Sequence, residues 1–348
     1  MTWNLAKLRH RPKPNKKLIN MILYPDNAIV MAPLSGYTDL PYRRSLRRYD
    51  CYYAFTEMID AGSLAYNNPN AAKMLTRGDD EPWLAVQLLG ADVEMLKKAT
   101  LKLNQYNFDL LDFNLGCPVA KVAKKGAGAM LGRNIDQAAK LLAMIVKLSR
   151  FPVTVKTRIF SETEVESTIK LAQALENAGA QTLTLHGRVK EKFYSGDVFY
   201  DTIAAVREAI KIPIIVNGGI NSRYTYENAL SQSGCSAAMI ARGAMGNPWL
   251  FDEIQNPQFI PPTVDALADE TERHVEEMLE FHGEASGFKL ARKIILDYLR
   301  GRGYSGELRA KISFLNNRQD LLEIISVIRN GPSERYWQNV SHERQLTR

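Results

Sequence analysis

Residues 153–186 read VTVKTRIFSETEVESTIKLAQALENAGAQTLTLH, and this stretch holds the repeating unit that decides the fold. It starts with a β-branched apolar run at 153–158, passes through a helical pattern at 163–178, and ends in a second apolar run at 182–186. Nearly continuous apolar runs are typical of parallel strands that are buried on both faces. Gly179 follows the helical pattern, where a helix end favours glycine. The unit therefore predicts two parallel strands joined by a helix.

Apolar runs of this kind recur along most of the chain. We count eight of them, at residues 28–31, 53–58, 83–89, 110–114, 153–158, 182–186, 214–217 and 238–241. Helical patterns follow most of the runs, for example at 94–104, 135–147, 163–178, 200–209 and 223–232. Eight β/α repeats predict an α/β fold, a closed TIM (β/α)8 barrel. A doubly wound open sheet is the alternative, but it rarely needs eight such units.

The rest of the chain predicts further parts on either side of the barrel. A Pro-rich linker, Gln-Asn-Pro-Gln-Phe-Ile-Pro-Pro, follows residue 254. Helical patterns then occupy 264–284, 287–300 and 306–329, and in the second of these Leu290, Ile294 and Tyr298 fall on one face. We predict a basic arm at 1–20, a barrel at 21–255, a linker at 256–262 and a small C-terminal helical domain at 263–348.

Composition excludes several classes of protein. No run of 18 apolar residues occurs, so no transmembrane helix is expected. Residues 1–20 are polar and basic and lack the apolar core of a signal peptide. The three cysteines, Cys51, Cys117 and Cys235, lie far apart and fit neither a disulfide framework nor a metal motif. A reducing cytoplasm is the default location.

Charge is unevenly distributed over a chain with a net charge of +7. Residues 1–20 contain six basic residues and no acid, and residues 289–318 contain eight basic residues and two acids. Between them, residues 265–284 contain eight acids. Basic patches of this size attract polyanions such as RNA. Charge alone is equally compatible with a solvated helix face and a basic arm that has no partner.

Polar and small residues gather where the predicted strands end. Because a barrel of this class has its active site at the carboxyl ends of the strands, these residues are candidates for ligand contact. They are Ala32-Pro33-Leu34-Ser35-Gly36, Glu57, Gln87, Asn114, Lys156, Arg158, His186, Asn217-Gly218-Gly219 and Ala241-Arg242-Gly243. The Gly-rich turns after the seventh and eighth strands are the usual phosphate site of barrels, and they favour a phosphate-bearing cofactor. Tight turns that need glycine for backbone reasons are the alternative.

Two of the strand-end residues suggest more specific chemistry. Lys156 lies in an apolar strand, where an ammonium group needs a partner. It could form a Schiff base, stabilise the anionic edge of a reduced flavin, or serve in a structural ion pair. His186 is followed by Gly187-Arg188, a position that favours ligand contact. No cluster with metal-ligand spacing occurs, so no catalytic metal is expected.

Cys117 differs from the other two cysteines, which we interpret as small core residues. It follows the fourth predicted strand, precedes a proline, and is followed by Lys121, Lys124 and Lys125 and the run 126–129 of glycine and alanine. Such a loop can move as a lid. A thiol near a cationic cluster can act as an acid or a nucleophile. Cys117 is therefore the candidate catalytic residue.

These motifs together resemble one known family, the tRNA-dihydrouridine synthases, over about residues 28–320. The most specific part is Asn114-Leu115-Gly116-Cys117-Pro118, followed by Gly-Ala-Gly at 126–128. The other matching motifs are Met31-Ala32-Pro33-Leu34-Ser35-Gly36, Gln87, Lys156-Thr157-Arg158, Leu185-His186-Gly187-Arg188, Asn217-Gly218-Gly219-Ile220 and Ala241-Arg242-Gly243. The segment from Ala291 to Arg309 also resembles that family's helical tRNA-binding domain.

The resemblance implies a cofactor, a substrate and a role for each site residue. FMN would lie across the barrel mouth and NADPH would reduce it. The residues implied to bind FMN are Pro33, Leu34 and Ser35 at the ring, Gln87 and Lys156 at its polar edge, and His186, Asn217, Gly218, Gly219, Ala241 and Arg242 at the phosphate. Hydride would pass to C6 of a uridine flipped out of tRNA, with Cys117 protonating C5 and with Asn114 and Arg158 orienting the base.

Other functions stay open at this point. A small-molecule FMN oxidoreductase of the dihydroorotate or dihydropyrimidine dehydrogenase type would share the phosphate turns and Lys156 but would not need a basic helical domain. A lysine-dependent aldolase would use Lys156 without a flavin. A tRNA-binding protein without catalysis is the alternative from another class. We expect a monomer without an obligate protein partner.

Overall fold

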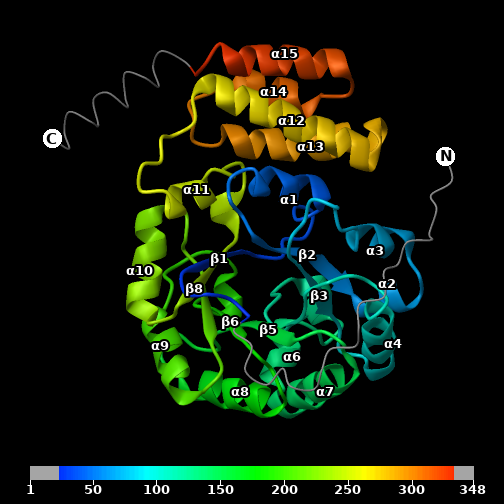
Figure 1. The fold of residues 1–348 in the computed structure, drawn as a ribbon, viewed down its shortest axis with the longest axis vertical. Coiled ribbons are helices and arrows are strands. Elements are labelled where there is room, and N and C mark those ends of the chain that lie inside the picture. Colours follow the sequence, from blue (N-terminus) through cyan, green and yellow to red (C-terminus); the bar gives the residue numbers. More distant parts are fainter. Residues whose placement is uncertain (1–22, 333–348) are drawn as a thin grey trace.

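The computed structural model describes residues 23–332 and shows a barrel closed by eight parallel strands (Figure 1). The strands are β1 (Ala28–Met31), β2 (Tyr53–Asp60), β3 (Leu84–Leu89), β4 (Leu110–Asn114), β5 (Val153–Arg158), β6 (Leu183–His186), β7 (Ile214–Asn217) and β8 (Ala237–Ile240). Each strand pairs with the next, and β8 pairs with β1. The predicted TIM barrel is confirmed and the open sheet is excluded. The basic arm predicted at residues 1–20 lies outside the described residues.

Helices surround the barrel and alternate with its strands. They are α1 (Leu40–Arg47), α2 (Ala61–Ala65), α3 (Pro69–Met74), α4 (Val93–Leu103), α5 (Ala120–Ala123), α6 (Ala129–Arg133), α7 (Ile135–Leu148), α8 (Glu166–Asn177), α9 (Tyr200–Ala209), α10 (Arg223–Ser233) and α11 (Leu250–Gln255). Local sequence fixes their ends. In α10, for example, Ser222 and Thr225 form a capping box, and Gly234 ends the helix in the left-handed conformation. The larger of two apolar clusters lies between the barrel and its helices and continues into the C-terminal helices, and a smaller one, with Val30, Phe55 and Met239, includes residues of the strands.

A separate layer of four helices follows the barrel: α12 (Val264–His282), α13 (Glu284–Leu299), α14 (Gly306–Ser313) and α15 (Arg318–Arg329). Figure 1 shows this layer stacked against the side of the molecule that carries α1 and α11. The C-terminal helices that we predicted are confirmed as a group. The single helix predicted at 306–329 is wrong, because Asn317 caps a new helix by accepting a hydrogen bond from the Asp320 N–H.

Several polar contacts hold the helical layer on the barrel. Arg48, just after α1, forms ion pairs of 2.7 Å with both Glu270 and Glu277 of α12. The Tyr37 hydroxyl donates a 2.8 Å hydrogen bond to Asp297 of α13. Because Tyr37 belongs to the loop between β1 and α1, the helical layer contacts a loop at the barrel mouth directly.

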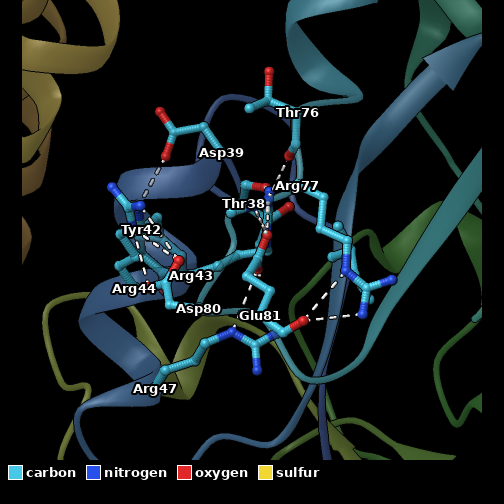
Figure 2. Close-up of polar contacts among 12 residues, drawn as sticks. Thr38, Asp39, Tyr42, Arg43, Arg44, Arg47, Thr76, Arg77, Asp80 and Glu81 are labelled. Atoms are coloured by element: carbon cyan, nitrogen blue, oxygen red, sulfur yellow. Dashed lines mark hydrogen bonds and ion pairs between the residues drawn. The ribbon is translucent and has the colours of Figure 1, made fainter. Parts of the chain in front are cut away.

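A buried ion pair between α1 and the segment that precedes β3 fixes the same loop, as Figure 2 shows. Arg43 of α1 donates two 2.8 Å hydrogen bonds to the carboxylate of Glu81. Its remaining donors bind the carbonyl oxygens of Thr38 and Thr76, each at 2.8 Å. Both charged side chains are almost fully buried, with exposures of 1% and 0%. Arg43 thereby joins three segments and anchors the end of the β1–α1 loop.

Removing the carboxylate of this pair should destabilise the fold strongly. In Glu81→Gln the Arg43 guanidinium stays buried without a counter-charge, and loss of one partner of such a pair costs about 3–5 kcal/mol. Asp80→Asn is the matched control, because it breaks the neighbouring and more exposed pair with Arg44, where the loss should stay below about 1 kcal/mol. Urea unfolding of both variants measures the two losses. Equal losses would contradict the structural role of the Arg43–Glu81 pair.

The contribution of Glu81 to the free energy of unfolding should also depend on pH. Burial alone would raise the pKa of Glu81, but the hydrogen bonds and charge of Arg43 outweigh burial and hold this pKa below its ordinary value. A lowered carboxyl pKa stabilises the fold above the unfolded value of about 4.3, and the stabilisation disappears as pH falls through the folded value. The stability gap between wild type and Glu81→Gln should therefore narrow in acid.

Candidate active site

Strand register brings residues that are distant in sequence together at the barrel mouth. Asn114 at the end of β4 pairs with Lys156 of β5. Arg158, at the end of β5, pairs with His186 of β6, which in turn pairs with Asn217 of β7. Because all eight strands run in the same direction, these side chains share the carboxyl end of the barrel.

The mouth contains one cavity of about 700 Å³. The fourteen residues to which the resemblance gives a role all line it: Pro33, Leu34, Ser35, Gln87, Asn114, Cys117, Lys156, Arg158, His186, Asn217, Gly218, Gly219, Ala241 and Arg242. Gly36 and Glu57, two other strand-end candidates, are not among the lining residues, and the Gly36 N–H donates to the Glu57 carboxylate instead. Tyr37, Arg188 and Tyr194, for which we predicted no role, also line the cavity. Arg188 stands in a matching motif, directly after His186-Gly187, so its motif could have indicated it. Nothing in the sequence distinguishes Tyr194 from other loop tyrosines.

The cavity wall is strongly cationic. Lys156, Arg158, Arg188 and Arg242 all line it, and no carboxylate is present among the described lining residues. The Nη1 atom of Arg188 is buried without a hydrogen-bond partner in the described structure. A buried donor without a partner is costly, so this atom indicates a place for an acceptor that a ligand brings. The wall therefore suits an anionic ligand.

The backbone at Gly218, in the turn after β7, lies close to the His186 side chain at the wall of the cavity. Gly218 has φ +125°, a conformation that side chains rarely adopt. A Cβ atom there would lie 2.9 Å from Cδ2 of His186. Glycine therefore lets the turn after β7 approach the His186 ring, which leaves backbone N–H groups near the cavity. His186 is buried, and burial, together with the charges of Lys156 and Arg158, lowers its pKa well below the ordinary value, so its ring is neutral.

Lys156 meets an amide rather than a counter-ion. Its ammonium donates a 2.9 Å hydrogen bond to Oδ1 of Asn217. Burial lowers the pKa of Lys156 to about 8, and the charge of Arg158 acts in the same direction. Because the ammonium lacks a directly bonded carboxylate, an anion bound in the cavity would complete its surroundings.

Cys117 is held by its backbone at the edge of the cavity. Its N–H donates a 2.9 Å hydrogen bond to Oδ1 of Asn114, and its carbonyl accepts one of 3.0 Å from Ala129. Gly128, at φ +61°, permits the second contact, because a Cβ atom there would lie 2.7 Å from the Cys117 carbonyl oxygen. The loop 126–129 thus packs back on Cys117, whose side chain is 8% exposed.

The surroundings keep the Cys117 thiol protonated. Burial raises its pKa above the ordinary value, and the hydrogen bond from Val119 and the positive charges of Arg158 and Lys156 offset only part of that effect. A neutral thiol can donate a proton, whereas a nucleophilic cysteine needs the thiolate. The structure therefore favours the acid of the two roles that the sequence left open.

Arg158 is bound to two loops of the mouth. Its Nε donates a 2.8 Å hydrogen bond to the Gly116 carbonyl, and its Nη1 contacts the carbonyls of Val189 and Phe193 at 3.1 and 3.2 Å. The guanidinium, 4% exposed, thus connects the Cys117 loop to the loop after β6. Arg158 therefore holds two loops of the mouth together, whether or not it also contacts a substrate base.

No group of three or more His, Cys, Asp or Glu residues between positions 23 and 332 is arranged to hold a metal ion. In the same part of the chain, no helix is long and apolar enough to cross a membrane.

Fold and cavity together define a TIM barrel with a cationic cavity at its mouth, lined by a thiol whose pKa burial raises. Comparison with known proteins then gives the family: the model of the dihydrouridine synthase (Dus) family matches residues 30–330, and the chain belongs to this family. It is 33% identical over 300 residues to tRNA-dihydrouridine synthase B of Pseudomonas aeruginosa, covering 84% of this chain and 89% of that protein. With the same synthase of Vibrio vulnificus it shares 32% over 320 residues, covering 90% and 97%.

Replacing Arg158 by lysine should loosen both loops, because one ammonium cannot reproduce the geometry of a planar guanidinium that contacts carbonyls on both sides. We expect trypsin to cleave Arg158→Lys faster than wild type after Lys190 or Lys192. Arg133→Lys is the control, since it changes only an exposed ion pair to Glu191 of the same loop. Mass spectrometry of the first fragments gives both rates, and equal cleavage of all three proteins would rule out the bridging role.

Proposed function

We propose that this protein is an FMN- and NADPH-dependent tRNA-dihydrouridine synthase, which reduces the C5=C6 bond of uridines in tRNA with Cys117 as the proton donor. The observation that carries the proposal is the protonated Cys117 thiol beside a cationic cavity in a chain of the Dus family. Relatives that match most of the chain are named tRNA-dihydrouridine synthases, which supports tRNA as the substrate.

The residues of the cavity fit FMN. Its phosphate needs backbone N–H groups and cations, which Gly218, Gly219 and Arg242 supply, with the unpartnered Nη1 of Arg188 nearby in the same wall. Asn217 and Ala241 belong to the same two turns, and His186 adjoins them as a neutral ring. The isoalloxazine ring of FMN would contact Pro33, Leu34 and Ser35 on one side, and Gln87 and Lys156 would lie at its polar edge.

The chain's own residues then perform the acid–base part of the reaction. When bound, reduced FMN supplies the hydride that reaches C6 of uracil. Cys117 holds the proton that C5 must receive, and its raised pKa keeps this proton on sulfur at neutral pH. Asn114 and Arg158 line the cavity next to Cys117, where they would orient the base. A flipped uridine would bring its ring within reach of the thiol.

Several parts of the surface would bind tRNA. Lys121 and Lys124 are exposed just after Cys117. In the helical domain the basic run is partly neutralised, since Lys311 pairs with Glu323, and Arg318 with Glu276 and Glu284. Lys289 and Arg309 are exposed there. We therefore propose that the rim of the mouth contributes to tRNA binding together with the C-terminal helices α12 to α15. The end of the predicted helical domain, residues 333–348, lies outside the described residues.

We also propose that NADPH is the reductant. The protein would act in the cytoplasm as a monomer, without an obligate protein partner. The arm at 1–20, with its six basic residues, would add to the attraction of tRNA.

Substitution of Cys117 tests the proposal directly. Purified protein should be yellow with bound flavin, and Cys117→Ala should still bind flavin and tRNA while forming dihydrouridine at least about 100-fold more slowly, the usual effect of losing a general acid. Cys235→Ala is the control, since Cys235 lies buried just before β8 and does not line the cavity. Mass spectrometry of digested tRNA measures the product.

Each negative result points to a different function. Full activity of Cys117→Ala would remove Cys117 from the mechanism. A flavoprotein that never reduces tRNA but reduces or oxidises free pyrimidines would be a small-molecule FMN oxidoreductase. A colourless protein that binds no added FMN would overturn the flavin proposal and leave an aldolase or a tRNA-binding protein.

Binding of FMN to the apoprotein should weaken as pH rises. The pKa of Lys156 is lowered to about 8 in the ligand-free protein, so its ammonium loses its proton around this pH and with it the attraction for an anion. Affinity should fall up to about tenfold per pH unit above this value, as one linked proton requires. Fluorescence titration of FMN against pH measures the effect. Lys156→Met should bind weakly at every pH, whereas Lys192→Met, at an exposed position, should follow wild type.

A further inference from the structure

We propose that Asp112, a residue inside the barrel, is a positioning residue that fixes Cys117 through the side chains of Gln87 and Asn114. The proposal rests on the proposed function, because it concerns the position of the thiol that delivers the proton. It adds a residue that does not line the cavity and that belongs to the middle of β4.

An unbroken series of hydrogen bonds runs from Asp112 to the Cys117 backbone. Gln87 donates through Nε2 to Oδ2 of Asp112 at 2.7 Å. Asn114 donates through Nδ2 to Oε1 of Gln87, also at 2.7 Å. Oδ1 of Asn114 then accepts from the backbone N–H groups of Gly116 and Cys117, at 3.1 and 2.9 Å.

Chemistry at the two ends determines the direction of every bond in this series. The Asp112 carboxylate can only accept, so Gln87 must turn its NH₂ group toward it. The backbone N–H groups can only donate, so Asn114 must turn its oxygen toward Cys117. Both amides can then bond to each other in one way alone, which is the way observed. Removing the acceptor at Asp112 frees Gln87 to rotate, and Asn114 loses the partner that keeps its oxygen on the Cys117 loop.

A carboxylate is a costly choice for this place, which argues for a specific task. Asp112 is fully buried, and Thr154 donates a 2.6 Å hydrogen bond to its other oxygen. Burial raises the pKa of Asp112 to about 6, while Thr154, Gln87 and the charge of Lys156 partly offset this. An apolar residue would avoid the desolvation cost but would leave Gln87 without its acceptor.

The test measures the Cys117 backbone position through thiol accessibility in the full-length, FMN-loaded protein. Iodoacetamide alkylation of Cys117 is followed by peptide mass spectrometry over a range of pH, so that the limiting rate of the thiolate is separated from its pKa. Asp112→Leu keeps the approximate volume of the side chain but removes the acceptor. We expect its limiting rate to rise about three- to tenfold, as the loss of one ordinary hydrogen bond implies.

Two control variants distinguish the positioning role of Asp112 from an effect of its charge and from an effect of packing around it. Asp112→Asn removes the charge but can still offer an oxygen to Gln87 while its NH₂ group donates to the Thr154 hydroxyl, so its limiting rate should match wild type. Thr154→Val removes the other hydrogen bond to the same carboxylate and should also match wild type. If Asp112→Leu does not fold, Asp112→Ser replaces it, since a serine hydroxyl is too short to reach Gln87.

A double-mutant cycle tests whether Asp112 acts through Asn114. Asn114→Ala should raise the limiting rate by itself, and adding Asp112→Leu should then change nothing further. Effects that multiply would show independent action and overturn the proposal, as would an unchanged rate in Asp112→Leu and Asp112→Ser.

Rate measurements test whether the position of Cys117 matters for dihydrouridine formation. In Asp112→Leu, dihydrouridine formation by pre-reduced enzyme in a single turnover should slow more than reduction of the flavin by NADPH, because Asp112 reaches the thiol through Asn114 and reaches the flavin only through one contact of Gln87. Equal slowing of both steps would mean a general structural defect and would contradict the positioning role. The alkylation rates do not depend on the reaction, so a protein inactive on tRNA with the expected alkylation pattern would sink the proposed function and leave the role of Asp112 intact.

Discussion

Pairing of β8 with β1 is the constraint on which the rest of the structure depends. Parallel strands leave unpaired backbone groups at both edges of a sheet, and these groups are satisfied here only because the last strand bonds to the first along Ala28 to Met31. Closure with all strands parallel sends eight carboxyl ends to one mouth. Register then decides which side chains become neighbours, as with Asn114 and Lys156. The site is thus a consequence of the barrel and not of any one loop.

Closure also places the polar groups of the mouth inside a largely apolar barrel, where a polar group without a partner is costly. Most of these groups are hydrogen-bonded to one another. Asp112, Gln87 and Asn114 share one series of hydrogen bonds, and Lys156 uses the amide of Asn217. Such networks stabilise a single arrangement only while every member is satisfied. The unpartnered Nη1 of Arg188 is an exception, and it belongs to a residue that lines the cavity.

Much of this could be predicted from the sequence, since apolar runs and glycines record local preferences. The runs gave all eight strands, although β8 begins and ends one residue earlier than predicted. Motifs gave fourteen residues of the cavity wall. The break between α14 and α15 was missed because Asn317 resembles any exposed polar residue until its side chain caps a helix.

Other features could not be predicted for a different physical reason. A barrel strand is buried on both faces, so alternation along β4 does not tell which residues point inward. Asp112 is a charged residue in an apolar strand, as Lys156 is, but no local pattern shows that its partners are Gln87 and Thr154. The carbonyl partners of Arg158 depend on how two loops meet, which no local pattern records.

One loop links the barrel mouth to the helical layer, and this link makes the two parts of the molecule depend on each other. Pro33, Leu34 and Ser35 line the cavity, and the next two residues reach the other domain. The Gly36 carbonyl accepts a hydrogen bond from Lys293, whose ammonium lies 3.8 Å from the centre of the Tyr37 ring, while the Tyr37 hydroxyl binds Asp297. A shift of α13 would therefore move the loop that shapes the cavity. Conversely, any macromolecule held by the helical layer is held at a set position relative to Cys117, because the same few contacts and the buried Arg43–Glu81 pair fix both.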